Sequence, residues 1–207
     1  MANYKKYFAA GIKKNYPKIP DAIIAKVDAY YGIISPDIAF SISSNHPIDK
    51  RLDFCAYFLA LIKTLDEQGE SFETTRRICL EIVSEYVRPK NKFQQIIKKL
   101  PAKLVNTWLG IYLLKKFAKR VSENSNPGGF IAHIITDKEK TFGLGYGVDI
   151  LECGICKLFS KHNYQKYSSI LCEADALTSD LAGLRLVRNS TIASGAKKCD
   201  FRWERKN

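Results

Sequence analysis

The spacing of apolar residues changes near residues 122–129 (SENSNPGG) from a helical period to a period of two. Before this break, apolar side chains recur every three or four residues, most clearly in residues 49–68, as on one face of an α-helix. The pattern predicts helices at 3–15, 21–32, 49–68 and 71–87, two basic helical segments on either side of Pro101 that end near Val121, and a loop or short strand at 35–47.

After the break, alternating apolar residues predict strands at 130–136 and 141–146, helices at 148–160 and 164–180, and two closing strands around Leu186 and Phe201. This order, β-β-α-α-β-β, is typical of an antiparallel sheet with helices to one side. We therefore expect an α+β fold in which a helical N-terminal half packs on a C-terminal antiparallel sheet of about four strands. Residues 1–207 would form a single domain, with a helical part at 1–121 and an α+β part at 129–205 that carries the site.

The net charge of +12 comes largely from one stretch. Between Glu85 and Glu123 there is no acidic residue, whereas ten lysines and arginines lie there. The stretch has few spaced aromatics and no nucleic-acid-binding motif, so we expect no nucleic-acid partner. Its second half, residues 103–120, has the wide apolar arc of a core helix. We predict that this helix packs against the sheet with Trp108 and Phe117 buried, that its lysines draw an anionic substrate, and that it contacts no membrane.

The chain begins without a long apolar run or a cleavage site, and it has no stretch as long as a membrane-spanning helix. Its six cysteines are too few for a dense disulfide framework, so they are interpreted as free thiols. These features predict a cytoplasmic protein. They give no indication of its oligomeric state.

The stretch from Leu186 to Arg202 (LVRNSTIASGAKKCDFR) holds the densest group of reactive side chains. Because side chains alternate along a strand, Arg188 should share the inward face of one strand and Cys199 the inward face of the next. A buried guanidinium needs an anion. Geometry alone favours a structural arginine–aspartate pair beside a core cysteine over a substrate site.

Two groups of cysteine and aspartate fall at helical spacing. Asp149, Cys153 and Cys156 should share one face of the helix expected at 148–160, where Asp149 is interpreted as a cap and the cysteines as core residues. A metal or redox role for this CxxC pair is disfavoured, because the pair would lie within a continuous helix rather than at a turn or a helix start. Cys172 and Asp175 also share a face, as a core thiol and a solvated carboxylate.

His133 alternates with Ile131 and Ile135 and is therefore expected to point inward, more often as a hydrogen-bonded core residue than as a catalyst. The glycines of GLGYG at 143–147 are better suited to a tight turn or bulge than to a phosphate cradle. Phosphate-binding loops, HExxH and GxSxG motifs are absent from the sequence.

Three motifs in order resemble one family. They are D-x3-C at Asp149 and Cys153, C-x2-D at Cys172 and Asp175, and R-x2-T-I-A-x-G-A-x2-C-D-F-R from Arg188 onward. Together they resemble the L-2-amino-thiazoline-4-carboxylic acid hydrolases. The specific part spans about 143–203, and the helical half shares only the general pattern. The ending also resembles, distantly, small-molecule-binding domains of the vinyl-reductase type, which bind ligands without turning them over.

The resemblance implies a hydrolase of carbon–nitrogen bonds other than peptide bonds, which opens a carboxylate-bearing cyclic amidine on the route to L-cysteine. A thiolate or a carboxylate-activated water would attack the amidine carbon, and an arginine fork would hold the carboxylate. The substrate would be small and anionic or zwitterionic, and we expect neither a cofactor nor a metal. The alternative is a non-catalytic binding or sensor module with the same pocket. The candidate catalytic residues are Asp149, Cys153, Cys172, Asp175 and Cys199, and the candidate substrate-binding residues are Arg188, Thr191, Asp200, Arg202 and His133.

Overall fold

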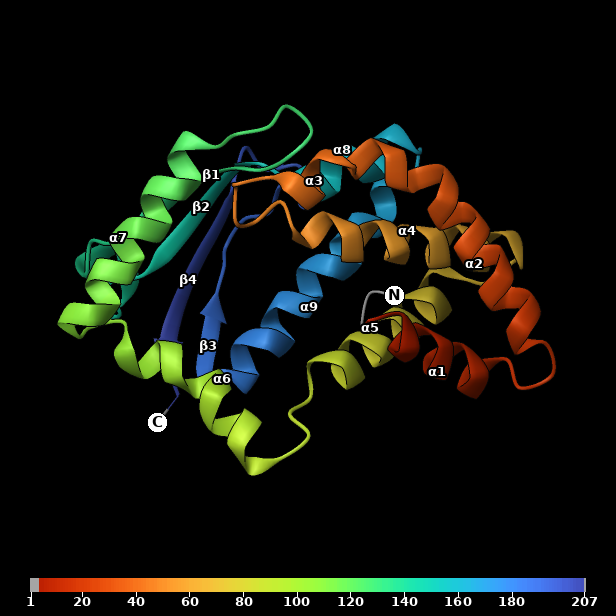
Figure 1. The fold of residues 1–207 in the computed structure, drawn as a ribbon, viewed down its shortest axis with the longest axis horizontal. Helices are drawn as coiled ribbons and strands as arrows, with labels where there is room; N and C mark the ends of the chain where they lie inside the picture. The colour runs from red at the N-terminus through yellow and green to blue at the C-terminus, as the bar shows by residue number, and fades with distance from the viewer. Residues whose placement is uncertain (1–3, 207) are drawn as a thin grey trace.

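The computed structural model describes residues 4–206 and confirms the α+β fold (Figure 1). The start of the first expected helix, residue 3, and residues 1, 2 and 207 lie outside this range. The helices are α1 (Lys5–Asn15), α2 (Pro20–Ile34), α3 (Phe40–Ser43), α4 (Arg51–Glu67), α5 (Phe72–Val87), α6 (Lys92–Leu104), α7 (Trp108–Glu123), α8 (Gly154–Lys161) and α9 (Ser168–Leu181). The strands are β1 (Ile131–Ile135), β2 (Gly147–Glu152), β3 (Leu184–Val187) and β4 (Cys199–Arg205), and short 3-10 turns include η1 (Ser35–Ile38), η2 (Glu139–Thr141), η3 (Gln165–Tyr167) and η4 (Ile192–Ser194).

The four strands form one antiparallel sheet in the order β1-β2-β4-β3. The two hairpins, β1–β2 and β3–β4, are joined through the β2–β4 pair, in which Asp149 lies opposite Asp200 and Ile150 opposite Cys199. Helices α8 and α9 connect the hairpins. The expected order β-β-α-α-β-β is therefore confirmed.

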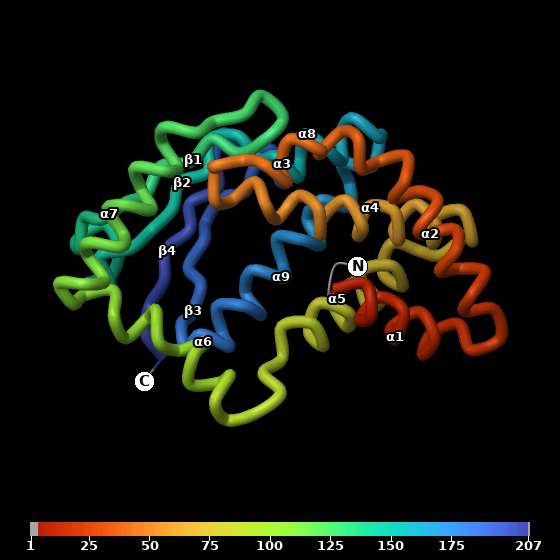
Figure 2. Tube along the Cα trace, viewed as in Figure 1, coloured from red at the N-terminus to blue at the C-terminus, as the bar shows by residue number. Residues whose placement is uncertain are grey.

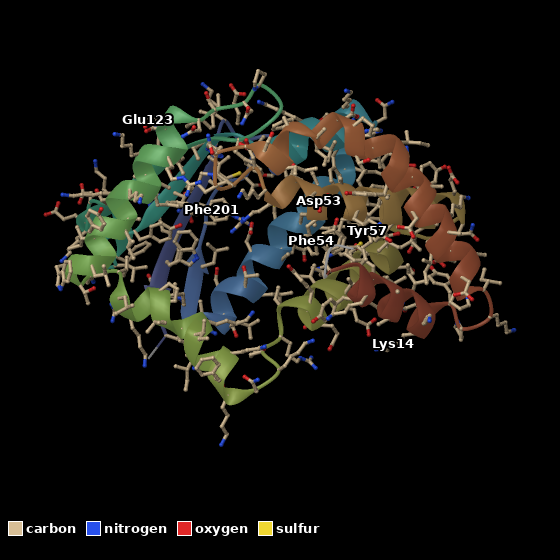
Figure 3. All side chains as sticks on the ribbon, in the orientation of Figure 1. Lys14, Asp53, Phe54, Tyr57, Glu123 and Phe201 are labelled. Carbon is tan, nitrogen blue, oxygen red and sulfur yellow. The ribbon has the colours of Figure 1, made fainter. Side chains whose placement is uncertain are left out.

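Helix α4 is the centre of the helical half. Eleven of its seventeen residues are buried, because it is apolar on nearly all sides and is covered by α2, α5 and α8 (Figure 2). On the side toward α1, Phe8 packs edge-to-face on Phe54 and Tyr57, with ring centroids 5.7 and 4.8 Å apart. Phe54 and Tyr57 are labelled in Figure 3. Each such buried ring stabilises the fold by roughly 1.5–3 kcal/mol.

A second, smaller core lies between the sheet and α7. It contains Val121 of α7, Val148 of β2 and Phe201 of β4. Ile48 and Ile150 pack against both cores and so connect the helical half with the sheet. We call the side of the sheet that meets α7 and α9 the inner face, and the opposite side the outer face.

A buried carboxylate fixes the break between the two halves. Asp49, just before α4, accepts hydrogen bonds from the Phe130 backbone N–H at 3.0 Å, the Asn126 amide at 2.6 Å and the Ser44 hydroxyl at 2.8 Å. A Cβ on Gly129 would lie 2.4 Å from this carboxylate, so only glycine permits the approach. Asp49 thus holds the polar segment 122–129 against the start of α4 and places the first strand.

The prediction of a helix at 148–160 is wrong. Residues Gly147–Glu152 form β2, and the helix α8 begins only at Gly154. Val148 and Ile150 alternate with Asp149, and pairing with β1 on one side and β4 on the other supplies all the backbone partners of a central strand. Short apolar runs fit either period, and here sheet pairing decides between them.

The strand expected at 141–146 is also misplaced. This segment forms the end of η2 and a tight turn, in which Phe142, Gly143 and Gly145 adopt positive φ angles of 51°, 75° and 69°. Left-handed residues cannot continue a strand, and glycine takes this conformation without steric cost. The interpretation of the GLGYG glycines as turn residues is thereby confirmed for Gly143 and Gly145, whereas Gly147 begins β2.

Two further predictions for the helical half are wrong. Residues 35–47 are mostly helical, as η1 and α3, rather than a loop or strand. Helix α7 does pack against the sheet through Phe117 and Val121, but Trp108 at its start is 80% exposed. The buried side of α7 is narrower than its apolar arc, so the predicted burial of Trp108 fails and Phe117 is only half-buried.

Candidate functional site

The sheet separates the predicted site residues into two groups. Val148, Cys199 and Phe201 point to the inner face and belong to its core. Asp149 and Asp200, one position along each strand, therefore point to the outer face. Residues of the same family motif thus end on opposite sides of the sheet.

On the inner face, Arg188 makes an ion pair with Asp175. Its Nη1 lies 2.9 Å from Asp175 Oδ2, and its Nη2 donates to the Cys172 carbonyl oxygen at 2.9 Å. The guanidinium carbon lies 4.8 Å from the centre of the Phe201 ring, which is labelled in Figure 3. Arg188 directly follows β3, and α9 packs along that strand, so adjacent elements bring the pair together. This is the structural arginine–aspartate pair that geometry favoured.

Beside this pair is a small cavity of about 120 Å³ between α4, α7, α9 and the sheet. Its walls include the rings of Phe117, Tyr146, Phe201 and Trp203. Tyr146 stacks on Trp203 with ring centroids 5.0 Å apart and planes within 8° of parallel. The Trp203 indole also donates to Ser179 Oγ at 2.9 Å, which fixes this wall to α9.

Asp175 and Arg51 are the charged side chains that line this cavity. The Asp175 side chain keeps 26% of its surface exposed. Burial raises the pKa of Asp175 above its usual value, although the nearby Arg51 and Arg188 guanidiniums act in the opposite direction. A carboxyl group with a raised pKa is a stronger base at neutral pH than an ordinary aspartate and is suited to proton transfer.

Arg51 is a site residue that sequence reasoning missed. It is the first residue of α4, and among residues 4–206 its side chain has no hydrogen-bond or ion-pair partner. A cation in the first turn of a helix opposes the helix dipole, which is the one local signal that could have drawn attention to it. Its distance in sequence from Asp175 hides their common cavity. Arg51 has the charge and the free donors to bind a carboxylate.

The predicted cysteines Cys172 and Cys199 lie near the Arg188–Asp175 pair, and the charges of Arg188 and Asp175 act on the ionisation of both thiols. Burial raises the pKa of Cys172 to about 12 and also raises the pKa of Cys199, whose sulfur accepts the Ile192 backbone N–H at 3.2 Å. Thiols with raised pKa values stay protonated at neutral pH and are weak nucleophiles. The inner face thus brings Arg188, Asp175, Cys172 and Cys199 together without making either sulfur reactive.

The CxxC pair is placed differently from the prediction. Cys153 is the N-cap residue of α8 and Cys156 lies in its first turn, so the pair is at a helix start and not within a continuous helix. The Cys153 thiol lowers the pKa of Cys156 by hydrogen bonding, whereas the same contact and burial raise the pKa of Cys153. The reason for disfavouring a redox role was therefore wrong. Within the described residues, however, no three His, Cys, Asp or Glu side chains are arranged to hold a metal ion.

On the outer face, Asp149 sits between two cations. Its Oδ2 lies 2.7 Å from Lys198 Nζ, and its Oδ1 lies 2.9 Å from Arg202 Nη2. Burial opposes the ionisation of Asp149, but the contacts with the two cations Lys198 and Arg202 outweigh it and lower the pKa. The side chain of Arg202 crosses Gly147, where a Cβ would lie 2.9 Å from it. This network holds β2 and β4 together from the outside.

The remaining predicted binding residues hold the loop between β3 and β4. Asp200 accepts hydrogen bonds from the backbone N–H groups of Asn189 and Ser190 at 3.1 and 2.7 Å, and these contacts help to lower its pKa against the effect of burial. Thr191 Oγ1 accepts the Ser194 backbone N–H at 3.1 Å and caps η4. His133 is exposed on the outer face of β1 opposite Asp149, so its predicted inward orientation is wrong.

A family model matches residues 51–203 of this chain, with the description L-2-amino-thiazoline-4-carboxylic acid hydrolase. The chain belongs to this family. The match covers most of the chain, begins at Arg51 and includes both faces of the sheet, so it extends well beyond the three motifs. Neither a search of curated proteins nor a search of solved structures found a match.

Proposed function

We propose that this member of the hydrolase family opens a small cyclic amidine bearing a carboxylate, such as 2-aminothiazoline-4-carboxylate, in the inner-face cavity. The observation that carries the proposal is that two opposite charges, from Arg51 and Asp175, line one cavity with aromatic walls. Arg51 is a cation with no ion-pair partner within the described part of the chain, and Asp175 is a carboxylate whose pKa is raised. The family supplies the reaction class, hydrolysis.

The size of the cavity supports a small substrate. Its volume of about 120 Å³ is well below that of sites for drug-sized ligands, which span roughly 300–1,000 Å³. A cavity of about 150 Å³ accepts benzene in another protein, so a substituted five-membered ring, which is larger than benzene, requires this cavity to widen on binding. The aromatic walls suit a flat, cationic amidine, because ring faces attract cations.

The charges orient the substrate in one direction. Its carboxylate pairs with the Arg51 guanidinium at the N-terminal end of α4, where the helix dipole also favours an anion. Its amidine then points toward Asp175 on α9. Arg188 anchors Asp175 from the other side through the 2.9 Å contact and is a positioning residue, since its guanidinium already has a carboxylate partner.

The chemistry requires one water molecule and one proton-transfer group. Asp175 takes a proton from water as the water oxygen bonds to the carbon of the cationic amidine, and it then gives that proton to the ring atom that leaves. The hydroxyl of the tetrahedral adduct becomes the carbonyl of the product and releases its proton to solvent. Breaking the C–S bond yields an N-carbamoyl-cysteine with a free thiol, and breaking the C–N bond yields an S-carbamoyl-cysteine with a free amine. Asp175 ends each cycle as a carboxylate. The protonated thiols of Cys172 and Cys199 favour this route over covalent catalysis.

The test is turnover of 2-aminothiazoline-4-carboxylate by the purified protein, followed by mass spectrometry together with a thiol reagent. We expect a carbamoyl-cysteine product that is lost in Asp175→Asn. The matched control is Asp180→Asn on the same helix, since Asp180 is 60% exposed and pairs with Lys206 away from the cavity. The proposal fails if wild-type protein leaves this and related cyclic amidine carboxylates unchanged, or if both variants behave alike.

The second candidate is a binding module with the same cavity and no turnover. Two observations favour it: Arg188 and Asp175 already bind each other, and the thiols of Cys172 and Cys199 beside them are not reactive. Calorimetric titration with the same compound separates the two functions. Binding that depends on Arg51, with no product after prolonged incubation, would favour the module.

A further inference from the structure

Helices α6 and α7 form a surface that is apolar and exposed. Of the fifteen large hydrophobic side chains exposed in the described chain, nine belong to these two helices. The described residues of α6 include no buried side chain, and α7 buries only Val121. The two helices run along one margin of the molecule, away from α1 and α2 (Figure 1). We call this the α6–α7 surface; its exposed apolar residues are Phe93, Ile96, Ile97, Leu100, Trp108, Leu109, Ile111, Tyr112 and Leu113.

The same surface is strongly basic. No acidic residue occurs between Glu85 and Glu123, and ten basic residues do. On α6, Lys92, Lys99 and Lys103 have no ion-pair partner among residues 4–206, and the same holds for Lys115 and Lys116 on α7. Protein carboxylates therefore leave most of this charge without compensation.

On each helix, the exposed apolar residues and the lysines lie side by side. On α6, Phe93, Ile96, Ile97 and Leu100 share one face at helical spacing, and Lys92, Lys99 and Lys103 fall along one edge of that face. On α7, Trp108 and Tyr112 lie in line with Lys115 and Lys119. Lysines beside a stripe of exposed aromatic and aliphatic residues are typical of helices that lie in a bilayer interface.

An apolar hollow of about 570 Å³ lies between the two helices and the edge of the sheet. Ile97, Leu100 and Leu104 of α6 and Leu113 of α7 line it, together with Leu184 of β3. Water would be in contact with this hollow in the isolated chain. Acyl chains or the glycerol region of a lipid layer would cover it.

We propose that the α6–α7 surface docks this protein on a membrane that contains anionic lipids. Phosphate headgroups pair with the free lysines, and Trp108, Phe93 and Ile96 enter the interface. The charge selects a lipid surface over a second copy of this chain, because two copies would bring the unpaired lysines of one surface against those of the other. None of the described helices is both long and apolar enough to cross a bilayer, so the association is peripheral.

This proposal reverses the expectation of no membrane contact. That expectation rested on burial of Trp108 and on lysines gathered at one end of a core helix. Trp108 is 80% exposed, and α6 adds lysines along its apolar face. The surface lies beside the inner-face cavity, since Phe117 and Tyr146 line both spaces.

The test is co-sedimentation of the full chain with phosphatidylcholine vesicles, with and without phosphatidylglycerol, at physiological ionic strength. We expect pelleting only with phosphatidylglycerol, accompanied by a blue shift of tryptophan emission. Trp108→Phe should abolish the shift but retain pelleting, since the other tryptophan, Trp203, is stacked in the inner-face cavity. The double substitutions Phe93→Ser/Ile96→Ser and Lys99→Gln/Lys103→Gln should each weaken partitioning roughly tenfold.

Matched controls lie elsewhere on the surface. Ile33→Ser removes an isoleucine of α2 that is 66% exposed, and Lys13→Gln/Lys18→Gln removes two exposed charges; both should leave partitioning unchanged. The proposal is overturned if anionic vesicles do not pellet the protein, or if the control and test variants bind alike. Self-association in analytical ultracentrifugation that Ile96→Ser removes, or retention by nucleic acid, in the absence of vesicle binding would also overturn it.

Discussion

The two faces of the sheet each hold a carboxylate beside cationic side chains, yet they tune it in opposite directions. On the outer face, Lys198 and Arg202 outweigh burial and lower the pKa of Asp149. On the inner face, burial outweighs Arg51 and Arg188 and raises the pKa of Asp175. Similar residue types therefore serve different purposes: Asp149 joins two strands, whereas Asp175 faces a cavity in a state suited to proton transfer.

The contrast between the two carboxylates is tested most directly by replacing each aspartate with asparagine, which removes the charge and keeps the shape of the side chain. Asp175→Asn should lower kcat by about 10²–10⁴, the usual contribution of a proton-transfer group. Asp149→Asn should lower kcat less than about tenfold, because it weakens only a strand contact. Steady-state kinetics of both variants provide the measurement. Equal losses would mean that the outer face takes part in the reaction.

Breaking the inner ion pair should cost stability as well as activity. Arg188→Met leaves Asp175 without its hydrogen-bonded partner, and we expect the free energy of unfolding to fall by about 3 kcal/mol. Urea denaturation measures this change. Arg188→Lys should lose about 2 kcal/mol of ligand interaction, since a point charge replaces the fork that positions Asp175.

A double variant separates stability from catalysis at this pair. Arg188→Met/Asp175→Leu replaces both charges with apolar side chains, so it should recover most of the lost stability and none of the activity. A double variant no more stable than Arg188→Met would show that the pair does not act as a unit.

The pH dependence of stability should differ in sign between the faces. The pKa of Asp149 is lower in the folded state than in the unfolded state, where it is about 3.9. Its contribution to stability is therefore present above the unfolded-state pKa and is lost as the pH falls through the folded-state pKa. Asp175 has a raised folded-state pKa, so the protonated form is favoured on folding, and stability is lost as the pH rises through that value.

Thermal unfolding from pH 2 to 8 measures both effects. Asp149→Asn should lower the free energy of unfolding by about 1–2 kcal/mol at neutral pH and leave it unchanged at the acid end of this range. The stability of Asp175→Asn should increase relative to that of the wild type as the pH rises. Parallel pH profiles for the two variants would contradict the opposite pKa shifts.

The smallest effect is expected from the cysteines beside the cavity. Cys172→Ser and Cys199→Ala should each retain kcat within about tenfold, because both thiols have raised pKa values and are protonated at neutral pH. Product formation by the two variants is the measurement. Complete inactivity of a variant that remains folded by circular dichroism would indicate covalent catalysis and contradict the water route.

Much of the fold follows from the sequence because it depends on local periodicity. The helical spacing of residues 49–68 predicted α4, and the alternation after residue 129 predicted β1, β3 and β4. The apolar neighbours of Arg188 and Cys199 correctly indicated the inner face, and the need of a buried guanidinium for an anion indicated an aspartate partner. These inferences require only the direction of side chains along one element.

The tertiary structure alone decided which faces and which distant residues meet. Residues 147–152 are short and apolar enough for either a helix or a strand, and only pairing with β1 and β4 made them a strand and moved Asp149 to the outer face. Arg51 and Asp175 meet because the start of α4 and the middle of α9 border the same cavity, which no local pattern encodes. The exposure of Trp108 likewise depends on how narrow a stripe of α7 the sheet can cover. Burial is a property of the assembled elements, and a single element's sequence sets only which residues share a side.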